Sequence, residues 1–167
     1  MDRGFNLERV ENSTQTIYFL SGYLDENSVL VPLALSEGKA LVLDLNQLHW
    51  VNSLGASKWM QWCAPAENRP TSVRYMRPPL VRLAGSFKGF LSPTWIIESF
   101  YVPCISQDQN EEEVLFENGK QFTPQEVRLP ALLSSESTGQ RLTLDVHPQL
   151  YFSFLKPHYP GLIIIGV

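Results

Sequence analysis

Two cysteine–histidine pairs are the first residues in this chain whose types suggest chemistry. A cysteine hydrolase needs a thiolate beside a histidine that a third group orients, and Cys63 with His49, or Cys104 with His147, would supply the parts. Neither pair lies in a recognisable nucleophile elbow or helix-terminus motif. Cys63 also falls on the apolar face of a predicted helix, where a small buried cysteine is the usual role. We therefore expect no catalytic cysteine and no enzyme activity.

Metal and nucleotide chemistry have no better support. A tetrahedral zinc site needs four ligands, whereas the last third of the chain offers Cys104 with His147 or His158. The segment from Gly85 to Gly89 lacks the length and the Lys-Ser/Thr ending of a phosphate-binding Walker loop. The sequence predicts neither a metal site nor a cofactor.

Ser53 is the remaining candidate, because it stands where the clearest helix begins. Apolar residues follow it at helical spacing until Pro65: Ala56, Trp59, Met60 and Cys63. A serine hydroxyl at such a position can accept a hydrogen bond from a backbone N–H one turn inward. Trp62 falls off this apolar stripe, so that an exposed partner-binding role and a core role both stay open.

The elements that would position Ser53 alternate between strands and helices. Apolar and β-branched runs predict strands at 16–20, 39–45, 71–76 and 95–102. Capping residues and apolar spacing predict helices over 25–34, 53–63 and 79–84. Parallel neighbours need long, usually helical connections, so this order predicts an α/β fold with a mixed, mainly parallel sheet and crossover helices.

The pattern of residue types changes after Val102. An acidic run leads into an apolar segment that ends at Asn118-Gly119, the strongest short signal for a β-hairpin. A short helix over 148–155 and an apolar strand over 162–167 follow. We expect one domain at 14–102 and a C-terminal hairpin and strand appendage at 103–167, packed on that core.

Three motifs in the first part of the chain resemble those of STAS domains, the family of sulfate transporters and anti-sigma factor antagonists. They are Phe19-Leu20-Ser21-Gly22-Tyr23-Leu24-Asp25, Ala40-Leu41-Val42-Leu43-Asp44-Leu45 and Val51-Asn52-Ser53-Leu54-Gly55. The resemblance covers about residues 14–102. The tail has a fainter likeness to a degenerate zinc-ribbon-type extension, in Leu144-Asp145 and in the segment from Tyr151 to Leu155.

The resemblance implies a bacterial regulatory protein-interaction module that a partner serine kinase or anti-sigma factor recognises. It implies phosphorylation of Ser53, although Asn52 stands where the family has an acidic residue. The implied switch loop and partner-binding residues are Asn52, Ser53, Leu54, Gly55, Trp62 and Asp25. The alternative is a constitutive scaffold or homo-oligomerisation protein with the same fold and no phosphoswitch, in which Ser53 only caps the helix.

The composition of the chain argues against some classes of binding partner. The chain has 167 residues, 44% of them hydrophobic, and a formal net charge of -4. It therefore has enough apolar residues for a core but no basic excess for nucleic acid or an anionic membrane surface. The beginning of the sequence lacks the apolar stretch of a signal peptide, and we expect a cytoplasmic protein that binds proteins.

Overall fold

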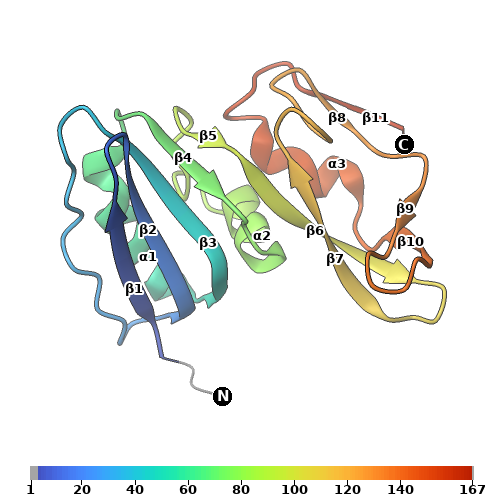
Figure 1. The fold of residues 1–167 in the computed structure, drawn as a ribbon, viewed down its shortest axis with the longest axis horizontal. Coiled ribbons are helices and arrows are strands. Elements are labelled where there is room, and N and C mark those ends of the chain that lie inside the picture. Colours follow the sequence, from blue (N-terminus) through green and yellow to red (C-terminus); the bar gives the residue numbers. More distant parts are fainter. Residues whose placement is uncertain (1–3, 167) are drawn as a thin grey trace.

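The computed structural model describes residues 4–166, drawn in Figure 1. Strand residues make up 39% of it and helical residues 19%. The strands are β1 (Asn6–Glu11), β2 (Gln15–Leu24), β3 (Ala40–Val51), β4 (Thr71–Arg74), β5 (Ile96–Ile97), β6 (Ser99–Ser106), β7 (Glu111–Glu117), β8 (Glu126–Arg128), β9 (Leu133–Ser134), β10 (Arg141–Leu144) and β11 (Ile163–Ile165). The helices are α1 (Ser53–Cys63), α2 (Pro78–Ser86) and α3 (Pro148–Tyr151), with 3-10 turns η1 (Ala64–Ala66) and η2 (Phe152–Leu155).

The first sheet has the strand order β1-β2-β3-β4-β5. Strand β1 is antiparallel to β2, and the remaining neighbours are parallel. Because parallel crossovers are right-handed and these strands follow one another in chain order, their connections lie on one face of the sheet. Figure 1 shows α1 behind the strands, so the face turned towards the viewer is not covered by this helix.

The connection between β2 and β3, residues 25–39, is not the predicted helix but an extended segment, which we call the crossover segment. Its β-branched Val29 and Val31 lose side-chain freedom in a helix, and Pro32 cannot donate a helical hydrogen bond. Contacts with other segments take the place of helical hydrogen bonds. Tyr18 Oη on β2 accepts a hydrogen bond from the Ala34 backbone N–H at 2.8 Å.

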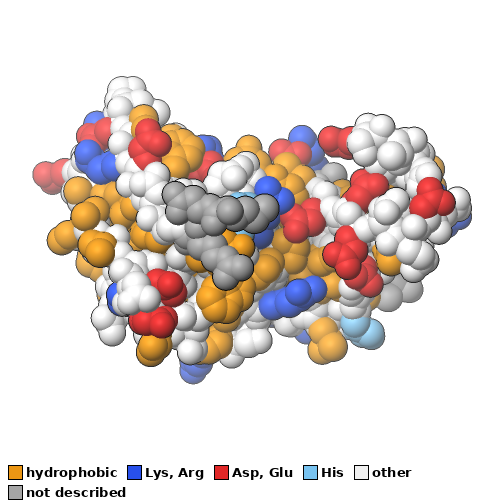
Figure 2. All heavy atoms as spheres, turned by 90° about the horizontal axis from the view of Figure 1, so that it is seen from below, with side chains coloured by type: hydrophobic (Ala, Val, Ile, Leu, Met, Phe, Trp, Pro, Cys, Tyr) orange, Lys and Arg blue, Asp and Glu red, His pale blue; other side chains and the backbone are white. Residues whose placement is uncertain are grey.

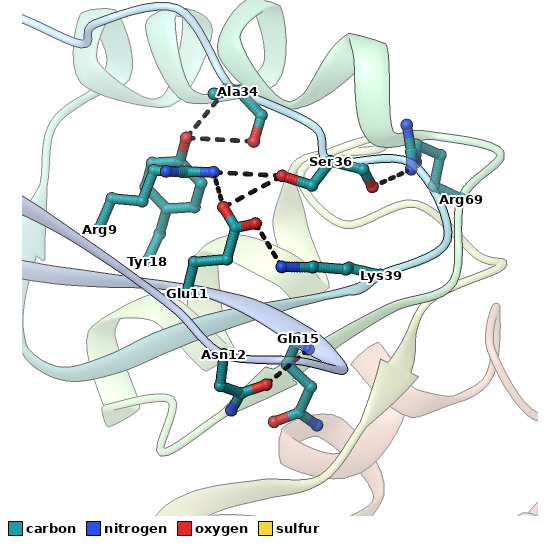
Figure 3. Close-up of polar contacts among 9 residues, drawn as sticks. All are labelled: Arg9, Glu11, Asn12, Gln15, Tyr18, Ala34, Ser36, Lys39 and Arg69. Atoms are coloured by element: carbon teal, nitrogen blue, oxygen red, sulfur yellow. Dashed lines mark hydrogen bonds and ion pairs between the residues drawn. The ribbon is translucent and has the colours of Figure 1, made fainter.

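Figure 3 shows how the far end of the crossover segment is fastened around Ser36. The Ser36 hydroxyl lies 3.1 Å from Glu11 Oε2, and its backbone oxygen accepts a hydrogen bond from Arg69 at 2.8 Å. Glu11 also forms ion pairs with Arg9 on its own strand and with Lys39. Side chains from β1 and from the loop before β4 thus hold this segment in place without any helix.

The last third of the chain is more than the expected hairpin appendage. It forms an antiparallel sheet of order β7-β6-β10-β9, and β8 pairs with β11 in parallel. The predicted turn at Asn118-Gly119 is present, with Gly119 at a φ of 84°, but only a single bridge joins Asn118 to Phe122 where a second hairpin strand was expected. Strand β6 continues past residue 102 without interruption.

The prediction of an α/β fold with helical crossovers, and with it a STAS-like architecture, is therefore wrong. The chain is mostly β, with a mixed sheet, a curled antiparallel sheet and short helices. One hydrophobic cluster nevertheless runs through both sheets. At its centre the Phe100 ring lies 5.0–6.0 Å from four other rings, those of Phe116, Phe122, Phe152 and Phe154.

Candidate functional site

The turn between β3 and α1 begins at Asn52, which caps the helix in place of Ser53. Asn52 has extended backbone angles, and its side-chain oxygen accepts a hydrogen bond from the Gly55 N–H at 2.7 Å. The amide nitrogen of the same side chain donates to Glu26 Oε2 at 2.6 Å. Asn52 therefore caps the N-terminus of α1 and joins it to the crossover segment.

Ser53 occupies the first helical position and is exposed. Its backbone oxygen accepts a hydrogen bond from Ser57 Oγ at 3.2 Å, while the cap bond belongs to Asn52. The expectation that the Ser53 hydroxyl caps the helix is wrong. The hydroxyl group is free of that role and accessible from solvent.

Gly55 is required by the close approach of this turn to the end of β2. A Cβ at position 55 would lie 2.1 Å from the Leu24 carbonyl oxygen. The Asn52 N–H donates to the same oxygen at 3.1 Å. The turn is thus bound tightly to the strand that leads into the crossover segment.

The start of the crossover segment is an Asp25-centred turn that α1 holds from the side. The Asp25 carboxylate accepts hydrogen bonds from Ser28 Oγ and from the Asn27 and Ser28 N–H groups, each at 2.9 Å. The hydrogen bond from Ser28 is the largest cause that lowers the pKa of Asp25. The hydrogen bond from Asn52 likewise lowers the pKa of Glu26. Both carboxylates are therefore ionised at neutral pH.

Two side chains of α1 bind the backbone of this segment. Lys58 Nζ donates to the backbone oxygens of Glu26 and Ser28. Trp62 Nε1 donates to the Val31 oxygen at 2.6 Å, and the Trp62 ring packs edge-to-face on Tyr18 at 5.4 Å. Trp62 is only 7% exposed, so of the two roles that the sequence left open for it the structure shows burial in the core.

Large apolar side chains are exposed on α1 and on the crossover segment. Leu54 is 57% exposed at the start of α1, and Val29 and Val31 are 76% and 53% exposed on the crossover segment. A shallow pocket of about 490 Å³ lies between helix and segment, lined by Ser28, Val29, Leu30, Lys58, Gln61 and Trp62. Figure 2, which looks at the molecule from the lower end of Figure 1, shows hydrophobic side chains mixed with acidic and basic ones over the left-hand part.

Sequence reasoning placed Asn52, Ser53, Leu54, Gly55 and Asp25 in this region, and the hydrogen bonds described above join the two turns that carry them. It missed Glu26 and Lys58, which make those connections. A signal was available for Glu26, which follows Asp25 directly, but none for Lys58, because its partners are backbone oxygens more than two dozen residues away.

The two thiols have little nucleophilic character. Cys63 is buried, and burial raises the pKa of its thiol well above the ordinary value. Burial, together with the charges of Glu112 and Asp145, raises the pKa of Cys104 to about 11. Both are therefore protonated at neutral pH. Within residues 4–166 no group of three histidine, cysteine or acidic side chains is placed to hold a metal ion.

A second polar cluster, unforeseen from the sequence, lies where the two sheets meet. Arg77 donates to the backbone oxygen of Asn46, forms an ion pair with Glu113 and stacks over the Tyr101 ring at 4.4 Å. Its side-chain nitrogens are thus taken up by links between β3, β6 and β7. We assign this cluster to the junction of the sheets and not to a ligand site.

Comparison of the chain with protein-family models, with curated proteins and with solved structures found no significant match. Among the described residues, no helix has the length and apolar character needed to cross a membrane.

Proposed function

We propose that this chain is a non-enzymatic regulatory module that binds another protein through the turn at 52–55 and the adjoining part of the crossover segment, residues 25–31. We call these residues the docking surface. The observation that carries the proposal is the exposure of Leu54, Val29 and Val31 on two segments that hydrogen bonds already hold together. A preformed surface loses little conformational entropy on binding, which favours affinity.

The charges of the docking surface suggest the chemistry of the partner. Asp25 and Glu26 belong to the same short segment as Val29, and the ammonium group of Lys58 is bound to backbone oxygens of Glu26 and Ser28. We therefore expect the partner to present an apolar side chain for Leu54 and Val29, flanked by at least one basic residue.

Phosphorylation of Ser53 would act on the hydrogen bond between Asn52 and Glu26. A phosphate adds about -1.5 to -2 charges at the start of α1, where the helix dipole favours it. The same charge repels the neighbouring Glu26 carboxylate, whose present partner is the Asn52 amide. Phosphorylation would therefore move Glu26 away from Asn52 and change the docking surface that the partner contacts. A serine kinase and an anti-sigma factor remain the expected partner types, from the sequence resemblance.

The test is a titration of a partner recovered from native lysate against a set of surface variants. Leu54→Ser and Val29→Ser should each weaken binding tenfold or more, which is about 1.4 kcal/mol. Leu132→Ser is the matched control, because Leu132 is 64% exposed on the C-terminal third of the chain. Equal affinities for all of these proteins would exclude the docking surface.

Two further measurements separate a switch from a constitutive scaffold. The mass of the protein purified from its own cells shows whether Ser53 carries a phosphate. In the titration, the partner's affinities for Ser53→Asp and for Ser53→Ala should differ by tenfold or more if the partner recognises the charge at position 53. Affinities within a factor of two for wild type and both variants would favour the scaffold without a switch.

A further inference from the structure

A pocket between α2 and the segment 146–153 shares no residue with the docking surface. It has a volume of about 380 Å³, within the range of small-molecule sites, and lies where α2 packs on α3 and η2. One wall is formed by Val81, Arg82, Gly85 and Ser86, which recur along one face of α2. The other wall comes from the C-terminal third of the chain. We call it the α2–α3 pocket.

Part of the α2–α3 pocket is apolar. Val81 is buried in it, whereas Leu150, which also lines it, is 73% exposed. A ligand with an apolar tail would cover Leu150, and the removal of apolar surface from water favours binding. Gly85 keeps the space open, because a side chain there would point towards Ser153, whose Oγ lies 3.7 Å from the position of a Cβ.

Arg82 gives the pocket a positive charge that the chain does not pair. Within residues 4–166 all arginines except Arg82 and Arg141 form ion pairs or side-chain hydrogen bonds. The paired ones are Arg9, Arg69, Arg74, Arg77 and Arg128. Among the described residues that line the α2–α3 pocket, none is acidic. The donors of the Arg82 guanidinium are therefore available to an anionic ligand.

The charge of Arg82 acts on the wall of the pocket. Burial raises the pKa of Tyr151, which lines the pocket, and the positive charge of Arg82 acts in the opposite direction. Tyr151 Oη is already used, since it donates to the Tyr101 oxygen. The side chains of Ser86 and His147 also line the pocket, and His147 makes no cap hydrogen bond to α3. They are further donors for an anion bound at Arg82.

A neighbouring hollow determines how much negative charge the ligand can carry. Arg82 lines this hollow too, together with the acidic side chains Glu111, Glu112, Glu113 and Asp145. These carboxylates repel a second negative charge on a ligand at Arg82. A carboxylate carries one negative charge, and its two oxygens match the paired N–H groups of a guanidinium. The charges thus favour a carboxylate over a phosphate dianion.

We propose that the α2–α3 pocket binds a small carboxylic acid with an apolar tail, of the size of a medium-chain fatty acid. The carboxylate binds the Arg82 guanidinium, with Ser86 or His147 as a further donor. The tail covers Leu150. This binding goes beyond the proposed function, since it uses no residue of the docking surface.

An NMR titration of the purified full chain with sodium hexanoate tests the site. The amide signals within 81–86 and 146–153 should shift to saturation, with a dissociation constant of about 1–5 mM, which is ordinary for so small a ligand. Octanoate should bind about tenfold more tightly, because two further methylene groups leave water. The neutral 1-hexanol should bind about tenfold more weakly than hexanoate, and hexyl phosphate at pH 8, a dianion, at least about threefold more weakly.

Three variants separate the charge from the apolar contact. Arg82→Gln should weaken octanoate binding tenfold or more and leave 1-hexanol binding within twofold of wild type. Leu150→Ser should weaken the binding of both about threefold, because both tails cover this side chain. Arg141→Gln is the matched control, since Arg141 is an exposed arginine without a partner among the described residues and lies outside the pocket. It should leave both affinities within twofold.

Several results would overturn the proposal. The absence of saturable shifts in the wild type at about 50 mM hexanoate, or shifts confined to other residues, excludes the site. Equal affinities for hexanoate and 1-hexanol exclude recognition of the carboxylate, and tighter binding of hexyl phosphate excludes this class of ligand. An equal loss of octanoate binding in Arg82→Gln and Arg141→Gln, or no loss in either, removes Arg82 as the partner.

The three substituted residues are exposed, so the variants are expected to fold. Melting temperatures within about 3 °C of wild type verify this. Binding of a partner protein to the docking surface is measured separately, so failure of this proposal and failure of the proposed function are distinguishable.

Discussion

At the scale of single residues, the Asn52 side chain makes two hydrogen bonds: it accepts one from the Gly55 N–H and donates one to Glu26. Replacing it by alanine should lower the free energy of unfolding by about 1 kcal/mol, the usual effect of losing a helix cap. Ser53→Ala should change it by less than about 0.5 kcal/mol, because Ser53 does not cap the helix and surface changes are usually small. Urea unfolding of the two variants beside wild type measures both. A larger loss for Ser53→Ala than for Asn52→Ala would contradict the assignment of the cap.

Two helical glycines differ in the space around them and make a matched pair. Gly55→Ala would place a methyl group 2.1 Å from a backbone oxygen, so the turn must move, and we expect a loss of at least about 2 kcal/mol. At Gly85 in α2 the nearest atoms lie 3.7 Å and 3.9 Å away. Gly85→Ala should stabilise the chain by up to about 1 kcal/mol. Equal effects in thermal unfolding would show that the turn at 55 is looser than described.

The burial of His158 leads to a prediction of how the free energy of unfolding depends on pH. Burial lowers the pKa of its ring below the ordinary value of 6.5, and one ring nitrogen lies 3.0 Å from the Trp95 oxygen. The folded chain therefore binds this proton less readily than the unfolded chain does. The contribution of the neutral ring is complete above pH 6.5 and is lost as the pH falls through the range between the unfolded and folded values.

The measurement is the free energy of unfolding of wild type and His158→Gln between pH 8 and pH 5. The wild-type value should fall more steeply below about pH 6.5 than that of the variant. Parallel curves for the two proteins would remove His158 as the cause.

At the scale of elements, the crossover segment depends on side chains from its neighbours. Trp62→Phe removes the hydrogen bond to the Val31 oxygen, and Tyr18→Phe removes those to Ala34. Each change should cost about 1 kcal/mol and should increase amide hydrogen exchange within residues 29–36 while leaving β3 protected. Trp50→Phe is the control, since Trp50 is 46% exposed on β3. Uniform exchange changes along the whole chain would show that the segment does not open by itself.

The same segment shows where prediction from sequence succeeds and where it fails. Helix α1 was predicted at 53–63 and is found there, because its apolar spacing and the stop at Pro65 are local signals. The apolar run at 39–45 likewise predicted a strand, and β3 begins at Ala40. The crossover segment has a helix-like apolar spacing too, but Tyr18, Trp62 and Arg69 hold it extended through contacts that no local pattern contains.

The residues of the candidate site also differ in how well the sequence predicts them. The turn residues were predicted because cap and glycine preferences depend on neighbours in the sequence. The sequence left the burial of Trp62 undecided, because that burial depends on packing against Tyr18 on a different element. Residue types indicate which interactions a surface can form, whereas contacts between distant segments determine which residues lie together on that surface.

At the scale of the whole molecule, both sheets contribute to one hydrophobic cluster. Phe100 on β6 belongs to the segment that leaves the first sheet, yet its ring contacts come from β7, η2 and the turn at Phe122. Tyr151 Oη also donates to the Tyr101 oxygen, and Tyr159 Oη lies near the Ile97 N–H. The C-terminal third therefore completes the core and does not merely cover it.

A chain shortened after Val102 tests this dependence. It would end inside β6 and leave Phe100, which is fully buried in the whole protein, without its four aromatic neighbours. Exposing so much apolar surface should make the shortened chain aggregate or lower its melting temperature by 10 °C or more, since a loss of 1 kcal/mol already lowers the melting temperature of a small domain by several degrees. Phe100→Ala in the full chain is the matched change and should cost about 3–5 kcal/mol, because it leaves a cavity at the same place. A shortened chain that stays soluble and melts at the wild-type temperature would show that residues 14–102 form an independent domain.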